Sequence, residues 1–163
     1  MNTSQIVLPQ PDELTRKEKD DAMGAYLMMF AALGVGLPLP VLNLVAASIY
    51  YFLNRRTSDF VGFHALQSLL SQIPVTLFNV AVVIWLIRIL ATDLIFPTPF
   101  FVLLAAMVLA NAVYISFSII AMVKARRGLF YYMPVFGRIA FARHYVNRTA
   151  SKPAGTNVPP EGF

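Results

Sequence analysis

Residues 63–73 read FHALQSLLSQI, which sets one histidine, two glutamines and two serines inside an otherwise apolar segment. On a helix with about 100° per residue, the polar positions and the asparagine at 79 share an arc of about 140°. Hydrocarbon cannot satisfy polar donors and acceptors, so this stripe must face protein, water or the headgroup layer if the helix lies in a membrane. The stripe consists of His64, Gln67, Ser68, Ser71, Gln72 and Asn79.

The composition around this stretch indicates an integral membrane protein. Of 163 residues, 58% are hydrophobic and 13% are charged, and the mean hydropathy is +0.64. An average soluble domain has roughly 25% charged residues. Between Ala22 and Val123 the charged residues are Arg55, Arg56, Asp59, Arg88 and Asp93. Charge is thus confined to the two ends and to short breaks, which favours a single membrane domain.

The apolar segments predict an all-α, polytopic membrane protein, a four-helix transmembrane bundle with a short broken first hairpin. The first apolar run is interrupted by GVGLPLP at residues 34–40, where each proline removes a backbone donor. Helices are expected at 22–37, 41–54, 59–91 and 99–127. The first two would reach roughly 24 and 20 Å, less than the 30 Å of a bilayer core, so they are expected to form a shallow hairpin.

The chain is expected to divide into four parts. A polar N-terminal segment covers 1–21, the four-helix membrane domain 22–127, an amphipathic interfacial segment 128–148 and a disordered tail 149–163. Basic residues flank the two ends and the second break, but not the breaks near 34–40 and 92–98. Because cytoplasmic loops are rich in lysine and arginine, this pattern predicts a multi-pass membrane protein with both termini cytoplasmic.

Reactive groups are scarce. The chain has no cysteine, which excludes disulfides, thiolate metal sites and cysteine nucleophiles. H-E-x-x-H, G-x-S-x-G, P-loop and G-x-G-x-x-G motifs are all absent. Asp59 and Asp93 lie at different breaks and cannot act as a carboxylate pair. We therefore expect a non-enzymatic protein without a catalytic, metal or cofactor site, and we attribute the net charge of +5 to topology rather than to nucleic-acid binding.

Two interpretations of the polar stripe remain open. In the first, the stripe packs helices together, since polar side chains hold membrane helices by interhelical hydrogen bonds. In the second, it lines a hydrated groove that contacts a substrate. The residues of this polar groove would be His64, Gln67, Ser68, Ser71, Gln72, Asn79 and Asn111.

Two motifs carry a family resemblance. FHALQSLLSQI with Phe60 before it, and the run Ala125-Arg126-Arg127-Gly128 followed by Pro134 to Ala140, resemble the signatures of the small Tic-type family. Its plant members are twenty-kilodalton subunits of the chloroplast inner-envelope import translocon. The resemblance implies a bacterial relative in the cell inner (cytoplasmic) membrane that assists protein translocation or membrane-complex assembly. Its implied partners are the lipid bilayer and other membrane proteins or further copies of the chain. The alternative is a passive channel or carrier for a small solute.

Overall fold

The computed structural model describes residues 8–30, 40–92, 95–145 and 155–160. Within these ranges the chain forms five α-helices and one 3-10 helix, and it contains no strand, so the all-α prediction is confirmed there. In chain order the elements are α1 (Arg16–Leu27), η1 (Met28–Phe30), α3 (Pro40–Asn54), α4 (Asp59–Ala91), α5 (Thr98–Arg126) and α6 (Phe136–Tyr145).

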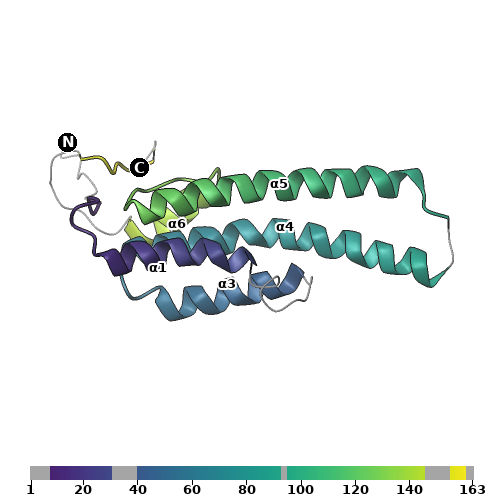
Figure 1. The fold of residues 1–163 in the computed structure, drawn as a ribbon, viewed down its shortest axis with the longest axis horizontal. Helices are drawn as coiled ribbons and strands as arrows, with labels where there is room; N and C mark the ends of the chain where they lie inside the picture. Colours follow the sequence, from purple (N-terminus) through teal and green to yellow (C-terminus); the bar gives the residue numbers. More distant parts are fainter. Residues whose placement is uncertain (1–7, 31–39, 93–94, 146–154, 161–163) are drawn as a thin grey trace.

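The long helices α4 and α5 form an antiparallel pair that runs the length of the molecule (Figure 1). They contain 33 and 29 residues, or about 50 and 44 Å of helix. Both are long and apolar enough to cross a membrane, and most of their apolar surface is exposed within the molecule. A helix buried in the core of a soluble protein would instead be covered by its neighbours.

The short helices lie along one half of this pair. Helices α1 and α3 pack beside α4 and stop part of the way along it, and α6 packs on the same half (Figure 1). With 12 and 15 residues, α1 and α3 reach about 18 and 23 Å. Four full spans are therefore not shown. The described residues contain two helices suited to span, and the first hairpin is short.

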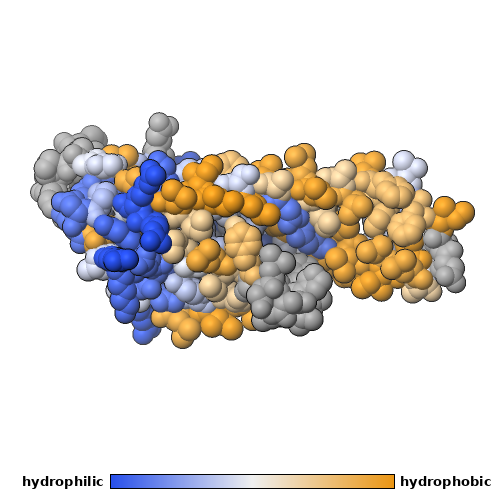
Figure 2. Space-filling view, in the orientation of Figure 1, coloured by the Kyte–Doolittle hydropathy of each residue, from blue (hydrophilic) through white to orange (hydrophobic). Residues whose placement is uncertain are grey.

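We call the two parts of the molecule the covered half and the bare half. The covered half comprises residues 59–73 of α4 with α1, α3, α6 and the last turns of α5. The bare half comprises residues 74–91 of α4 with residues 98–112 of α5. Figure 2 shows hydrophilic residues gathered at the end where α1 begins, and mostly hydrophobic residues over the bare half.

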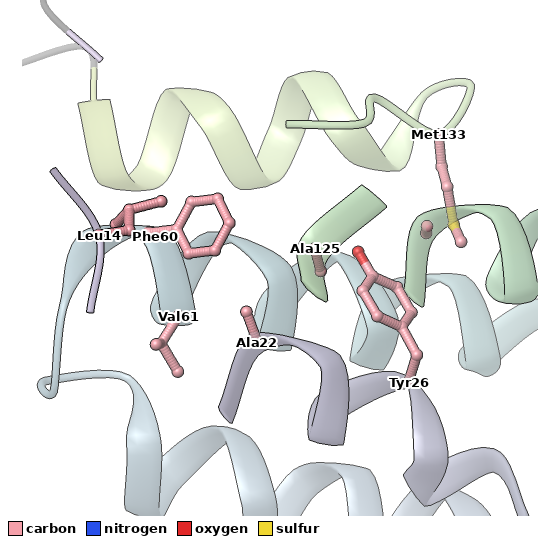
Figure 3. Packing of buried hydrophobic residues seen from close by; sticks show 8 residues of the cluster. Leu14, Ala22, Tyr26, Phe60, Val61, Ala125 and Met133 are labelled. Atoms are coloured by element: carbon pink, nitrogen blue, oxygen red, sulfur yellow. The ribbon is translucent and has the colours of Figure 1, made fainter. Parts of the chain in front are cut away.

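The core of the covered half joins α1, α4 and α5. Figure 3 shows Leu14, Ala22, Tyr26 and Phe60 converging with Ala125 and Met133 from other elements. Alanines face one another where α1 meets α5, because Ala22, Ala121 and Ala125 are all fully buried. Small side chains let helix backbones approach closely, as in membrane helix packing.

Most of the predicted helix limits are close to those observed. Helix α4 begins at Asp59 as predicted, with the Ser58 hydroxyl accepting from the Val61 amide at 3.3 Å. Helix α5 ends before Gly128, whose φ of +76° is the left-handed conformation that glycine commonly adopts just after a helix. Helix α6 lies within the predicted interfacial segment.

Helix α1 begins at Arg16, six residues before the predicted start, so its first turns lie in the segment predicted only as polar. Thr15 and Glu18 form a reciprocal capping box that starts the helix there. The predicted end of this helix and most of the 34–40 break lie outside the described residues.

The C-terminal tail is described over residues 155–160. Asn157 is buried, and its side-chain amide donates to the carbonyls of Pro9 and Gly128 at 2.7 and 2.9 Å. Its Oδ1 accepts from the amide of Phe130 at 3.1 Å. Residues 155–160 thus pack on the covered half, while 149–154 and 161–163 lie outside the described residues, and disorder of the tail 149–163 stays a prediction.

Candidate functional site

The polar stripe begins with a buried chain of hydrogen bonds. The Gln67 side-chain amide donates to the Tyr26 hydroxyl oxygen at 2.8 Å, and this hydroxyl lies 2.9 Å from Nδ1 of His64. All three side chains are buried. The buried hydroxyl proton of Tyr26 needs an acceptor, and Nδ1 of His64 lies within hydrogen-bond distance, so we assign this proton to the bond with Nδ1. The imidazole proton is then on Nε2.

Gln67 also holds the chain that follows α5. Its Nε2 donates to the carbonyl of Tyr131 at 3.0 Å, and its Oε1 accepts from the amide of Met133 at 3.1 Å. These two bonds fix the orientation of the side-chain amide. Gly137 packs so closely here that an added Cβ would lie 2.7 Å from Cα of Tyr132 and 2.8 Å from Oε1 of Gln67. Hydrogen bonds and close packing therefore hold the side chain of Gln67 in one position.

The next polar residues bond locally and to α1. Ser68 donates to the carbonyl of Ala25 at 2.8 Å, and Ser71 donates to the carbonyl of Ser68 at 2.9 Å. Gln72 makes one long bond, 3.4 Å from its Nε2 to Oγ of Ser68. All of these side chains are buried, so the stripe joins α4 to α1 and to the segment after α5.

The bare half contains a separate polar contact. Asn79 on α4 and Asn111 on α5 exchange side-chain hydrogen bonds of 3.1 and 2.8 Å. Asn111 also donates to the carbonyl of Met107 at 2.8 Å. This amide pair forms reciprocal hydrogen bonds between two helices that otherwise meet through apolar side chains, among them Val82, Ile89 and Phe100.

Three buried polar atoms of this region have no hydrogen-bond partner. They are Nε2 of His64, Oε1 of Gln72 and Oγ of Ser118. The His64 ring is surrounded by Phe60, Phe63 and Phe130, with ring centroids 4.6, 4.9 and 5.9 Å away. The polar side chains therefore form a closed cluster that is surrounded by aromatic and aliphatic side chains.

The structure brings five predicted groove residues together and separates two. His64, Gln67, Ser68, Ser71 and Gln72 lie in the covered half, whereas Asn79 and Asn111 pair with each other further along. The first five are at most 4% exposed. This geometry favours the packing interpretation, because protein atoms occupy the space in front of the stripe. A hydrated groove remains a prediction.

Sequence reasoning included Asn111, the partner of Asn79, but missed the partners of Gln67. Tyr26, the Tyr131 carbonyl and the Met133 amide are separated from Gln67 by 41, 64 and 66 positions. One signal was present for Tyr26, since a tyrosine in an apolar segment requires a partner for its hydroxyl. No group of three or more metal-binding side chains gathers within the described ranges.

An apolar groove lies beside the polar cluster. It has a volume of about 520 Å³ and is lined by α4, α5 and residues 133–136. Ser71 and Tyr114 line it together with apolar side chains such as Val75, Val113 and Phe117. This groove was not predicted from the sequence.

Fold and site together define an all-helical protein with two helices suited to span a membrane and a buried polar cluster that joins the shorter helices to them. The sequence model of one family matches residues 19–140, most of the chain. The chain belongs to the MamF/MmsF family, the magnetosome magnetite crystal formation protein family. No curated protein and no solved structure matches the chain significantly.

This family assignment overturns the Tic-type resemblance and the protein-transport function inferred from it. The physical reason lies in the two motifs themselves. Gln67 binds the segment that carries the second motif, Gly128 takes a left-handed backbone conformation, and Gly137 leaves room for Gln67. These residues serve helix packing, and a packing pattern does not specify translocation.

Proposed function

We propose that this chain is a non-enzymatic integral protein of the magnetosome membrane that supports magnetite crystal formation. The observation that carries the proposal is the family match over residues 19–140. The apolar pair α4 and α5 supports membrane insertion, since both helices are long enough to cross a bilayer core of about 30 Å. In this proposal the magnetosome membrane replaces the bacterial inner membrane expected from the sequence.

The proposed topology is a spanning α4–α5 hairpin with both termini on the cytoplasmic side. Basic residues support it, because Arg16, Arg55 and Arg126 stand at the start of α1, the end of α3 and the end of α5. These three helix ends meet at one end of the molecule (Figure 1). The α1–α3 hairpin then enters the bilayer only part of the way from the same side.

The non-catalytic part of the proposal is supported by how the polar side chains are used. His64 and Gln67 are buried and bonded to protein atoms, so neither is presented to a reactant. Asn79 and Asn111 likewise satisfy each other. We propose that the protein acts through its place in the membrane, together with other membrane proteins or further copies of itself.

Deletion of the gene in its magnetosome-forming host tests the proposal. We expect electron microscopy of the deletion strain to show smaller or misshapen magnetite crystals, restored by the full chain. A fluorescent fusion should co-purify with isolated magnetosomes and resist alkaline extraction. Crystals unchanged by the deletion, or a fusion confined to the cell envelope, would contradict the proposal.

A further inference from the structure

The apolar groove is too large to be a packing defect. Its volume of about 520 Å³ lies within the range of roughly 300–1,000 Å³ of ligand pockets, whereas packed interiors hold few voids larger than a water molecule. Pro74 and Val75 form its α4 wall, and Ala106, Ala110 and Val113 form its α5 wall. Water does not fill apolar cavities stably. The lining therefore favours an apolar occupant over water.

The groove continues onto surface that faces outward. Leu109 and Val113 line it and are 66% and 47% exposed. Leu77, one turn beyond Pro74 on α4, is 63% exposed. If α4 and α5 span the membrane, bilayer hydrocarbon borders this surface directly. The nearest available occupant is then a lipid acyl chain.

A strained turn closes one end of the groove. Val135 has a φ of +65°, and the Phe136 amide donates to the carbonyl of Pro134 at 2.7 Å, which is the pattern of a γ-turn. A β-branched residue with positive φ is rare and costly. The turn directs both Pro134 and Phe136 into the groove lining. The backbone strain at Val135 thus lies between two residues, Pro134 and Phe136, that line the groove.

The lining suits a flexible chain better than a second helix. Small side chains at an interface are what let two membrane helices approach closely. Ala106 and Ala110 provide such side chains at one edge, but Tyr114, Phe117 and Phe136 are bulky. A narrow, bendable hydrocarbon chain can pass between such side chains, whereas a helix about 10 Å wide cannot.

We propose that this groove binds one acyl chain of a membrane phospholipid between α4, α5 and the 133–136 turn. The inference rests on the proposed membrane location of the protein. Bound lipid would fill the space between the two spanning helices and stabilise the turn at Val135.

Lipid retention tests the proposal. The full chain is reconstituted in vesicles of phosphatidylethanolamine and phosphatidylglycerol, extracted in mild detergent, washed and analysed by native mass spectrometry. We expect one retained phospholipid on the wild-type protein. The double variant A106F/A110F fills the groove and should reduce retention roughly tenfold, the equivalent of about two buried methylene groups.

The matched control is A105F/A112F, which adds the same rings to exposed positions of α5 outside the groove. It should retain lipid as the wild type does. Helical content and elution as a single species check folding, and A110F alone replaces the double variant if that one unfolds. Equal loss in groove and control variants would overturn the proposal, as would retention of only detergent or free fatty acid. Dimers abolished by A106F/A110F would overturn it in favour of helix docking.

Alkaline extraction of the same vesicles separates this inference from the proposed function. Protein that remains in the vesicles but retains no phospholipid refutes the groove site alone. Protein released by alkali refutes the membrane location, and with it both proposals.

Discussion

The covered and bare halves of α4 use polar residues differently. In the covered half, α1 and the 131–133 segment provide hydrogen-bond partners, so a histidine, two glutamines and two serines can be buried. In the bare half the helix pair contains one interhelical amide contact, Asn79 with Asn111. Polar side chains are therefore concentrated where protein can satisfy them. This difference is what a helix pair surrounded by hydrocarbon requires.

The largest loss of folding stability is expected for a substitution at the centre of the covered half. Gln67→Leu removes the partners of the Tyr131 carbonyl and the Met133 amide, so we expect it to lower the free energy of unfolding by about 3 kcal/mol. Thermal and denaturant unfolding in detergent measure the change.

Gln72→Leu is the matched control for Gln67→Leu. It makes the same substitution at a buried site five residues later, where Gln72 has one long bond and an unpartnered Oε1. We expect a change below about 1 kcal/mol. Equal destabilisation by both substitutions would show that burial alone, and not the bonds of Gln67, determines the stability of this half.

A smaller loss is expected at the glycine beside Gln67. Gly137→Ala places a Cβ 2.7 Å from Cα of Tyr132, and such overpacking costs about 2 kcal/mol. The same unfolding measurements apply. Ala142→Ser on the exposed face of α6 is the control and should stay within about 0.5 kcal/mol. Wild-type stability in Gly137→Ala would mean that α6 is not held against Gln67.

The start of α1 provides a third test. Thr15→Ala removes the capping box and should cost about 1 kcal/mol, measured as the difference from wild type at pH 7. The hydrogen bond from Thr15 holds the pKa of Glu18 below its usual value of 4.5. This stabilisation is complete above pH 4.5 and is lost as the pH falls through the lowered pKa. The difference in free energy of unfolding between wild type and Thr15→Ala should therefore become smaller in this pH range. A difference that does not change with pH would argue against the capping box.

The smallest contribution to folding stability is expected from the asparagine pair in the bare half. A double-mutant cycle with Asn79→Leu and Asn111→Leu should give a coupling energy of about 0.6 kcal/mol, typical of hydrogen bonds between membrane helices. The double variant should be close to wild type, because leucine pairs pack well where hydrocarbon surrounds the helices. A coupling as large as the effect of Gln67→Leu would remove the distinction between the halves.

Local signals predicted the helices better than their contacts. The helix expected at 59–91 agrees with α4, and the one expected at 99–127 differs from α5 by one residue at each end. The start of α1 was missed because the charged residues after Thr15 were interpreted only as polar, although the spacing of Thr15 and Glu18 is a capping-box signal.

The candidate site was predicted only in part. Periodicity identified the stripe from His64 to Gln72, since its residues share one helix face. Its partners come from segments 38 to 66 positions away, which periodicity cannot reveal. Asn157 illustrates the same limit, because it bonds to Gln10 across 147 positions. The function inferred from the family resemblance was wrong, because the residues of both motifs serve helix packing and do not specify translocation.

Solvent accessibility of nitroxide labels tests the central claim, that hydrocarbon surrounds the bare half and water reaches the end of the covered half where α1 begins. The chain has no cysteine, so single cysteines can be placed at Leu77, Ile84 and Ile87 in the bare half and at Lys17 in the covered half. In reconstituted vesicles we predict frequent collisions with oxygen and few with a water-soluble nickel complex at the first three sites, and the reverse at Lys17. Equal access of the nickel complex to all four sites would contradict the account.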